Sequence, residues 1–135
     1  MRWNSWTAVA VILAAGTLAG SPALAACRFN TTVVVQGPPE ARMPAGSRLH
    51  LTIFDGNLAD APMSMTAVAA VSRPVPGRRF PIVVPIRVRS DKRCPIQPAL
   101  SAQVKVGDRL VFFNDTRTEV RPGGRSPIQL KPLAY

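Results

Sequence analysis

The sequence has 135 residues, 47% of them hydrophobic, with 17 Lys and Arg against seven Asp and Glu and only two Cys. That length supplies one compact domain with a sizeable hydrophobic core and excludes two. The net charge of +10 indicates anionic surroundings or partners. The basic residues are dispersed along the chain, however, which is typical of solvated surface charge.

The first 26 residues have the three-part layout of a secretory signal peptide. Arg2 supplies a positive charge, an apolar run follows over residues 8–15, and small residues precede Cys27. Gly and Pro interrupt the apolar run before it reaches the roughly 20 residues that a membrane-spanning helix needs. Cleavage is therefore expected, and it leaves 109 residues with a net charge of +9, because Arg2 is the only charged residue removed.

The end of this signal, Leu24-Ala25-Ala26-Cys27, resembles a bacterial lipobox, in which the cysteine sulfur receives a diacylglycerol. We predict cleavage between Ala26 and Cys27, a lipid on Cys27, and a short lipid-anchored tether over residues 27–30. The alternative is ordinary cleavage after Ala25, with Ala23-Leu24-Ala25 as an A-x-A site. Cys27 would then be free to form a disulfide with Cys94 in the oxidising periplasm, a bond that a lipid on Cys27 forbids.

The rest of the chain, residues 31–135, consists of short segments rich in Val, Ile, Thr and Phe between frequent Gly and Pro residues. This pattern predicts an all-β domain. The period of two is clearest in residues 48–55 and 80–88, and two apolar runs flank Gly107-Asp108 as in a hairpin. Residues 63–72 also alternate, although their alanines suit a helix. The predicted strands are 31–36, 48–55, 63–72, 80–88, 101–106, 109–114 and 126–131.

Seven short strands at this spacing can bury their apolar faces by forming two packed sheets. We expect a single β-sandwich of antiparallel strands, with a small β-barrel as the alternative. Pro81 and Pro85 cannot donate to a strand ladder, so the strand over residues 80–88 is predicted at a sheet edge.

The sequence contains no evident catalytic set. His50 is the only histidine and lies in a strand pattern, which favours a structural or surface role. One His and two distant Cys are a poor supply of zinc ligands, and the calcium-loop and phosphate-loop patterns are absent. The few aromatic residues do not interleave with basic ones as they do in proteins that bind single-stranded nucleic acid. We therefore predict no enzyme activity, no metal, no cofactor and no nucleic-acid partner.

A family resemblance rests on the order and spacing of several short motifs over residues 33–132. The chain resembles the YscW/YbaY family of bacterial lipoproteins, and most closely its type III secretion pilotins. The matching residues are Met43-Pro44-Ala45-Gly46-Ser47-Arg48-Leu49, Leu51, Ile53, Asp55, Asp60-Ala61-Pro62, Gly77, Phe80-Pro81, Pro85-Ile86, Ala102, Val104, Gly107-Asp108-Arg109-Leu110, Phe112, Asp115-Thr116 and Val120.

The resemblance implies a lipid-anchored β-sandwich on the periplasmic side of the outer membrane. A pilotin binds the C-terminal region of a secretin subunit, and its acyl chains, handled by the lipoprotein sorting machinery, bring the pair to the outer membrane for ring assembly. Arg28 after the cysteine, in place of an inner-membrane retention aspartate, agrees with that destination. The alternative is a housekeeping YbaY-like envelope lipoprotein that binds anionic lipid, glycan or peptidoglycan.

A binding surface for the secretin is predicted on the proline-bearing strand, where an apolar row lies between basic residues. Such a surface suits an amphipathic or acidic segment, although protection of a sheet edge explains the same prolines. The predicted partner-binding residues are Arg78, Arg79, Pro81, Val83, Pro85, Arg87 and Arg89.

Overall fold

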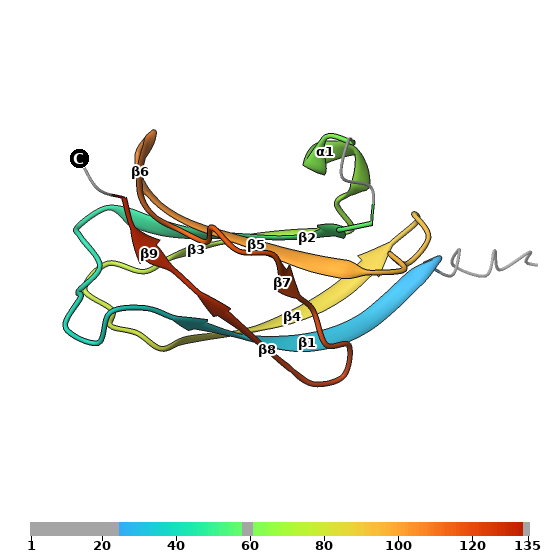
Figure 1. Cartoon of the computed structure of the whole chain (residues 1–135), viewed down its shortest axis with the longest axis horizontal. Coiled ribbons are helices and arrows are strands. Elements are labelled where there is room, and N and C mark those ends of the chain that lie inside the picture. Colours follow the sequence, from blue (N-terminus) through green and yellow to red (C-terminus); the bar gives the residue numbers. More distant parts are fainter. Residues whose placement is uncertain (1–24, 58–60, 134–135) are drawn as a thin grey trace, which may run out of the picture.

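The computed structural model describes residues 25–57 and 61–133, which form two β-sheets packed face to face (Figure 1). Residues 1–24 of the predicted signal peptide, which spans residues 1–26, and the motif residue Asp60 lie outside the described residues. The elements are β1 (Cys27–Gln36), β2 (Ser47–Asp55), α1 (Met63–Thr66), β3 (Ala69–Pro74), β4 (Ile82–Ser90), β5 (Pro98–Val106), β6 (Arg109–Phe113), β7 (Thr118–Glu119), β8 (Arg125–Gln129) and β9 (Lys131–Pro132).

The two sheets differ in size. The smaller has the strand order β4-β1-β8, and the larger has the order β3-β2-β5-β6-β9, with β7 also paired to β5. The predicted all-β sandwich is confirmed, and the sheets are not closed into a barrel. The expectation that all strands are antiparallel is wrong at one place, because β1 and β8 run parallel. The chain between them makes a long return through the larger sheet, which allows a parallel pair.

The core lies between the sheets and is built by the alternation seen in the sequence. Every second residue of β4 is buried, and the intervening residues face solvent. β4 lies at the edge of its sheet, as Pro81 and Pro85 predicted. The inward residues of the two sheets include Val33, Val35, Ile82, Val84, Ile86 and Val88 on one side, and Leu49, Leu51, Ile53, Leu100, Ala102 and Val104 on the other.

The predicted tether over residues 27–30 is the beginning of β1. Cys27 pairs with Ser90 of β4, and the register continues without a break to Asn30 and Arg87. The inward alternation of β1 extends back to Cys27, which is fully buried and belongs to the hydrophobic core. The strand therefore starts four residues earlier than predicted because the apolar Cys27 and Phe29 continue its buried face.

The predicted strand over residues 63–72 is wrong in its first half, where the chain forms the single helical turn α1. The N–H of Ala67 donates to the carbonyl oxygen of Met63, 2.8 Å away. Met63 and Met65 are exposed, so their alternation does not reflect a buried face, and the good helix propensity of Met prevails. The strand β3 follows at Ala69.

The hairpin between β5 and β6 forms about Gly107-Asp108 as predicted. Gly107 has a φ of 59°, in the left-handed region that glycine adopts without steric cost. Within the described part of the chain, none of the helices is both long and apolar enough to cross a membrane.

Candidate functional site

The predicted partner-binding residues lie mainly on the outward face of the three-stranded sheet. Val83, Pro85, Arg87 and Arg89 alternate with the buried residues of β4 and are exposed. Pro81, one residue before β4, has the same parity and is also exposed. These five residues therefore form one row along the edge strand.

The neighbouring strands extend this row into a surface, which we call the outer face. Register places Val34 beside Val83 and Thr32 beside Pro85, and Pro127 of β8 lies on the far side of Val34. This part of the surface is apolar or uncharged. A second part is basic, and its exposed side chains are Arg28, Arg87, Arg89 and, from β8, Arg125.

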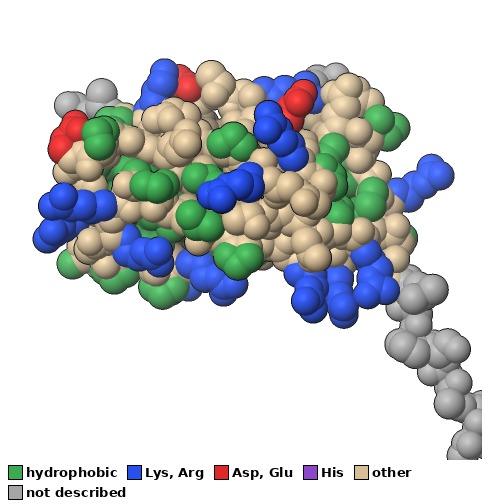
Figure 2. Space-filling view, turned by 90° about the horizontal axis from the view of Figure 1, so that it is seen from below, with side chains coloured by type: hydrophobic (Ala, Val, Ile, Leu, Met, Phe, Trp, Pro, Cys, Tyr) green, Lys and Arg blue, Asp and Glu red, His purple; other side chains and the backbone are tan. Residues whose placement is uncertain are grey.

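The outer face is open to a partner and has one sign of charge. Its three strands contain no Asp or Glu. Figure 2 views the molecule from this side and shows basic side chains around apolar ones, with the few acidic groups near the upper rim. An arrangement of this kind complements a segment that carries both apolar and acidic residues.

Arg78 and Arg79 lie away from the basic part of the outer face. They lie in the turn between β3 and β4, at the opposite end of β4 from Arg87 and Arg89. The carbonyl oxygen of Arg78 accepts a hydrogen bond from the N–H of Met43 at 2.8 Å, and Arg79 forms an isolated bridge with Arg42. The structure thus brings together five of the seven predicted residues.

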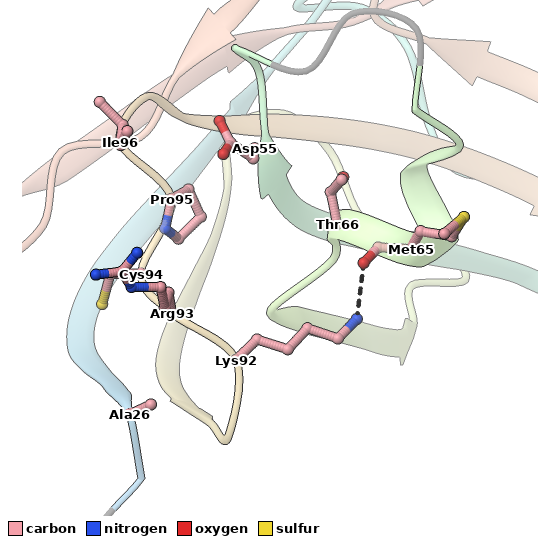
Figure 3. A pocket seen from close by; sticks show the side chains of 9 residues that line it. All are labelled: Ala26, Asp55, Met65, Thr66, Lys92, Arg93, Cys94, Pro95 and Ile96. Carbon is pink, nitrogen blue, oxygen red and sulfur yellow. Dashed lines mark hydrogen bonds between the residues drawn. The ribbon is translucent and has the colours of Figure 1, made fainter.

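An open pocket of about 600 Å³ lies at the end of the sandwich where β1 begins (Figure 3). The Nζ of Lys92 donates to the carbonyl oxygens of Met65 at 3.1 Å and Ala67 at 3.2 Å, so the loop over residues 91–97 is connected to α1. Met65 and Ile96 on its rim are 69% and 82% exposed. The lining residues are Ala26, Asp55, Met65, Thr66, Lys92, Arg93, Cys94, Pro95 and Ile96.

The sequence did not predict this pocket. Its rim comes from α1, where the sequence predicts a strand, and from the irregular segment around Cys94. Pro62, which is the N-cap residue of α1, followed by two Met residues of good helix propensity, was the available signal for the turn. Nothing in the sequence placed that turn beside the loop over residues 91–97.

A disulfide joins Cys27 to Cys94, with a Cα–Cα distance of 4.6 Å across 67 residues of sequence. The bond uses the Cys27 sulfur that the predicted lipid requires, so a molecule with this disulfide carries no lipid there. Lipidation of Cys27 stays a prediction, and it applies only to a molecule that lacks the Cys27–Cys94 disulfide. The alternative considered from the sequence, a bond between the two cysteines, is the arrangement that the structure has.

His50 lies on β2, beside Ser72 of β3 and Gln103 of β5. Partial burial and the positive charges of Lys105 and Arg48 lower its pKa from 6.5. These cationic neighbours do not resemble the carboxylate that orients a catalytic histidine. Among the described residues, no three His, Cys, Asp or Glu side chains are placed to hold a metal ion.

A solved structure has the same fold. It is the structure of an alternative pilotin from the type II secretion system of Vibrio cholerae, with a TM-score of 0.69 and 22% sequence identity. The superposition covers 81% of this chain and 100% of that chain. No curated protein matches the sequence.

The family comparison covers most of the described domain. The model of the type III secretion system lipoprotein chaperones (YscW) matches residues 30–130. This range contains every strand of the sandwich apart from the first residues of β1 and the short β9. The chain therefore belongs to the YscW family of type III secretion system lipoprotein chaperones.

Proposed function

We propose that this protein is a pilotin: a chaperone that binds the C-terminal region of a type III secretin subunit and promotes its assembly into a ring at the outer membrane. The family match over residues 30–130 carries this proposal, because that range includes the whole outer face except Arg28. A binding protein without turnover also agrees with the setting of His50, which has basic neighbours.

The outer face is the docking surface in this proposal. An amphipathic secretin segment would place apolar side chains over the exposed Val83, Pro85 and Pro127. Its carboxylates would lie near Arg87 and Arg89, where the sheet supplies no competing acid. Complementary charge of this kind raises the association rate and fixes the register of a bound segment.

The route to the outer membrane is a separate matter from binding. The sequence predicts a lipid on Cys27, handled by the lipoprotein sorting machinery, with the domain on the periplasmic side. That route needs a free Cys27 thiol in the precursor, whereas Cys27 is bonded to Cys94 in this structure. The proposal of secretin binding does not depend on which of the two states the exported protein adopts.

The test is the affinity of the purified domain for a peptide that covers the secretin C-terminal region. We expect Arg87→Glu together with Arg89→Glu to weaken binding by roughly tenfold or more, because like charges would then face the acidic segment. The matched control reverses Arg48 and Arg109, which are exposed on the larger sheet. Equal affinity of both double variants would reject the outer face, and no binding by the unmodified domain would reject the pilotin function.

The acid-free outer face also favours the alternative, an envelope protein of the YbaY kind that binds anionic lipid or glycan. Vesicles with and without anionic lipid separate the two functions. Binding that salt abolishes, with no affinity for the secretin peptide, would support the alternative.

A further inference from the structure

The sulfur of Cys27 is the target of two mutually exclusive reactions. A diacylglyceryl group would be held by a thioether, a carbon–sulfur bond that does not take part in thiol–disulfide exchange. The disulfide to Cys94 uses the same sulfur. The two states therefore cannot interconvert, and the choice is made when the precursor is processed.

Burial places Cys27 among the core residues. Its side chain is fully buried, as is that of Val88 on the adjacent strand β4. A lipidated cysteine must direct its acyl chains into a membrane. To do so from this position, the first pairs of β1 with β4 would have to separate, beginning with Cys27 and Ser90. No residues between Cys27 and β1 are available as a tether, because the strand begins at Cys27 itself.

The fold also supplies the partner cysteine without further rearrangement. The pairing of β1 with β4 places Cys27 opposite Ser90, and Cys94 lies four residues beyond Ser90 in the following loop. This register depends on the apolar alternation of both strands over nine residue pairs. Folding therefore brings the only two cysteines of the chain together.

We propose that the exported protein carries the Cys27–Cys94 disulfide in place of a lipid, and that its signal is removed by hydrolysis of the Ala25–Ala26 bond. A disulfide-bearing oxidant protein of the exporting compartment accepts the electrons. One cysteine thiolate attacks that disulfide to form a mixed disulfide, and the second cysteine displaces the oxidant. The two thiols of this chain are oxidised, and their two electrons and two protons pass to the oxidant, which leaves as a dithiol.

Ala26 is then the first residue of the protein. It is exposed and lines the same pocket as Cys94. The protein of this proposal is an unanchored member of a family of lipoprotein chaperones, in which a covalent bond within the domain occupies the position of the lipid. This inference concerns processing and does not rest on secretin binding.

The first experiment is the intact mass of the full chain, expressed with its own signal in a Gram-negative host and purified without reductant. We expect an N-terminus at Ala26, no acyl group, and a mass that rises by two hydrogens on reduction. An N-terminus at Cys27 with diacylglyceryl and acyl groups would overturn the proposal.

Two variants within the removed signal separate the processing routes without changing the mature domain. Ala23→Tyr disrupts the A-x-A site but lies outside the four-residue lipobox, whereas Leu24→Asn disrupts the lipobox at the middle position of A-x-A. We expect the precursor to accumulate with Ala23→Tyr and to be processed normally with Leu24→Asn. The reverse pattern would overturn the proposal. Both readouts are independent of the affinity for the secretin peptide, so this inference and the proposed function can fail separately.

Discussion

The two ends of the sandwich are held together in different ways. At the end with the turns over residues 37–46 and 75–81, Met43 is 2% exposed and Val75 is 1% exposed, and both belong to the core. The N–H of Gly77 donates to the carbonyl oxygen of Met43 at 2.9 Å. At the other end, the loop over residues 91–97 and α1 contain exposed side chains. A disulfide joins this loop to the start of β1, and Lys92 joins it to α1.

The two ends therefore differ both in what stabilises them and in how many apolar side chains they expose to solvent. An end that is held by packing has its apolar side chains inside, whereas an end that is held by a covalent bond can leave Met65 and Ile96 exposed. Segments with few buried apolar contacts open locally at low free-energy cost. The disulfide end should therefore be the more mobile one, and its order should depend on an oxidising compartment.

Removal of the disulfide should have the largest effect of the changes considered. Closing a 67-residue loop in the unfolded chain is worth about 4 kcal/mol in the chain-entropy model. We expect the double variant Cys27→Ser, Cys94→Ser to lose stability of that order in urea unfolding. The reduced unmodified protein should unfold at nearly the same urea concentration as the variant. A variant as stable as the oxidised protein would show that packing alone holds this end.

The packed end should respond to a change of a single carbon. A Cβ at Gly37 would lie within 2.7 Å of three atoms of the Phe80 ring, and that ring packs edge-on against Phe112, with a centroid distance of 5.4 Å. We expect Gly37→Ala to cost about 1–3 kcal/mol in the free energy of unfolding, because the ring has to move within a packed core.

Gly124→Ala is the matched control for this clash. An added Cβ there would meet its nearest neighbour at 3.7 Å, an ordinary contact, so stability should change little. In a double-mutant cycle, Phe80→Leu should relieve part of the cost of Gly37→Ala. Additive effects of the two substitutions would contradict the clash.

The sequence predicted those parts of the fold that depend on alternation. The strand over residues 48–55, the edge strand and the hairpin about Gly107 were confirmed. In a half-buried strand, apolar and polar residues alternate along the sequence, so a local pattern is enough to predict it. The row from Pro81 to Arg89 on the outer face follows from the same rule. The parallel pair of β1 and β8 was not predicted, because it depends on the path of the whole chain.

The disulfide end could not be predicted in the same way. Cys27 belongs both to a local sequence motif, the lipobox, and to a disulfide with the distant Cys94. The register of β1 with β4, which brings the two cysteines together, cannot be deduced from the local motif. The pocket depends on contacts between α1 and the loop over residues 91–97, about 27 residues apart in sequence. Local patterns do not encode such contacts.

The Lys92 contacts provide a smaller test of the disulfide end. Lys92→Met removes the hydrogen bonds to the carbonyl oxygens of Met65 in α1 and of Ala67, which follows α1. Since the side chain is exposed, we expect global stability to fall by less than about 1 kcal/mol. Amide exchange at Ala67, which donates to Met63, should become faster. Lys131→Met, which removes the exposed ion pair with Asp115, should leave that exchange rate unchanged.

The smallest expected effect is a pH dependence of stability. It arises from His50 in the larger sheet and does not involve either end of the sandwich. Burial and the charges of Lys105 and Arg48 lower the pKa of His50 from 6.5, so the unfolded chain binds the proton more readily than the folded one. Stability should therefore fall as the pH drops through 6.5 and stop falling below the folded pKa. The hydrogen bond from Lys131 lowers the pKa of Asp115 from 3.8. The stability that this carboxylate contributes is therefore lost only as the pH falls below 3.8. His50→Gln should flatten the upper part of the unfolding profile, measured between pH 5 and 8, and an unchanged slope would assign it to another group.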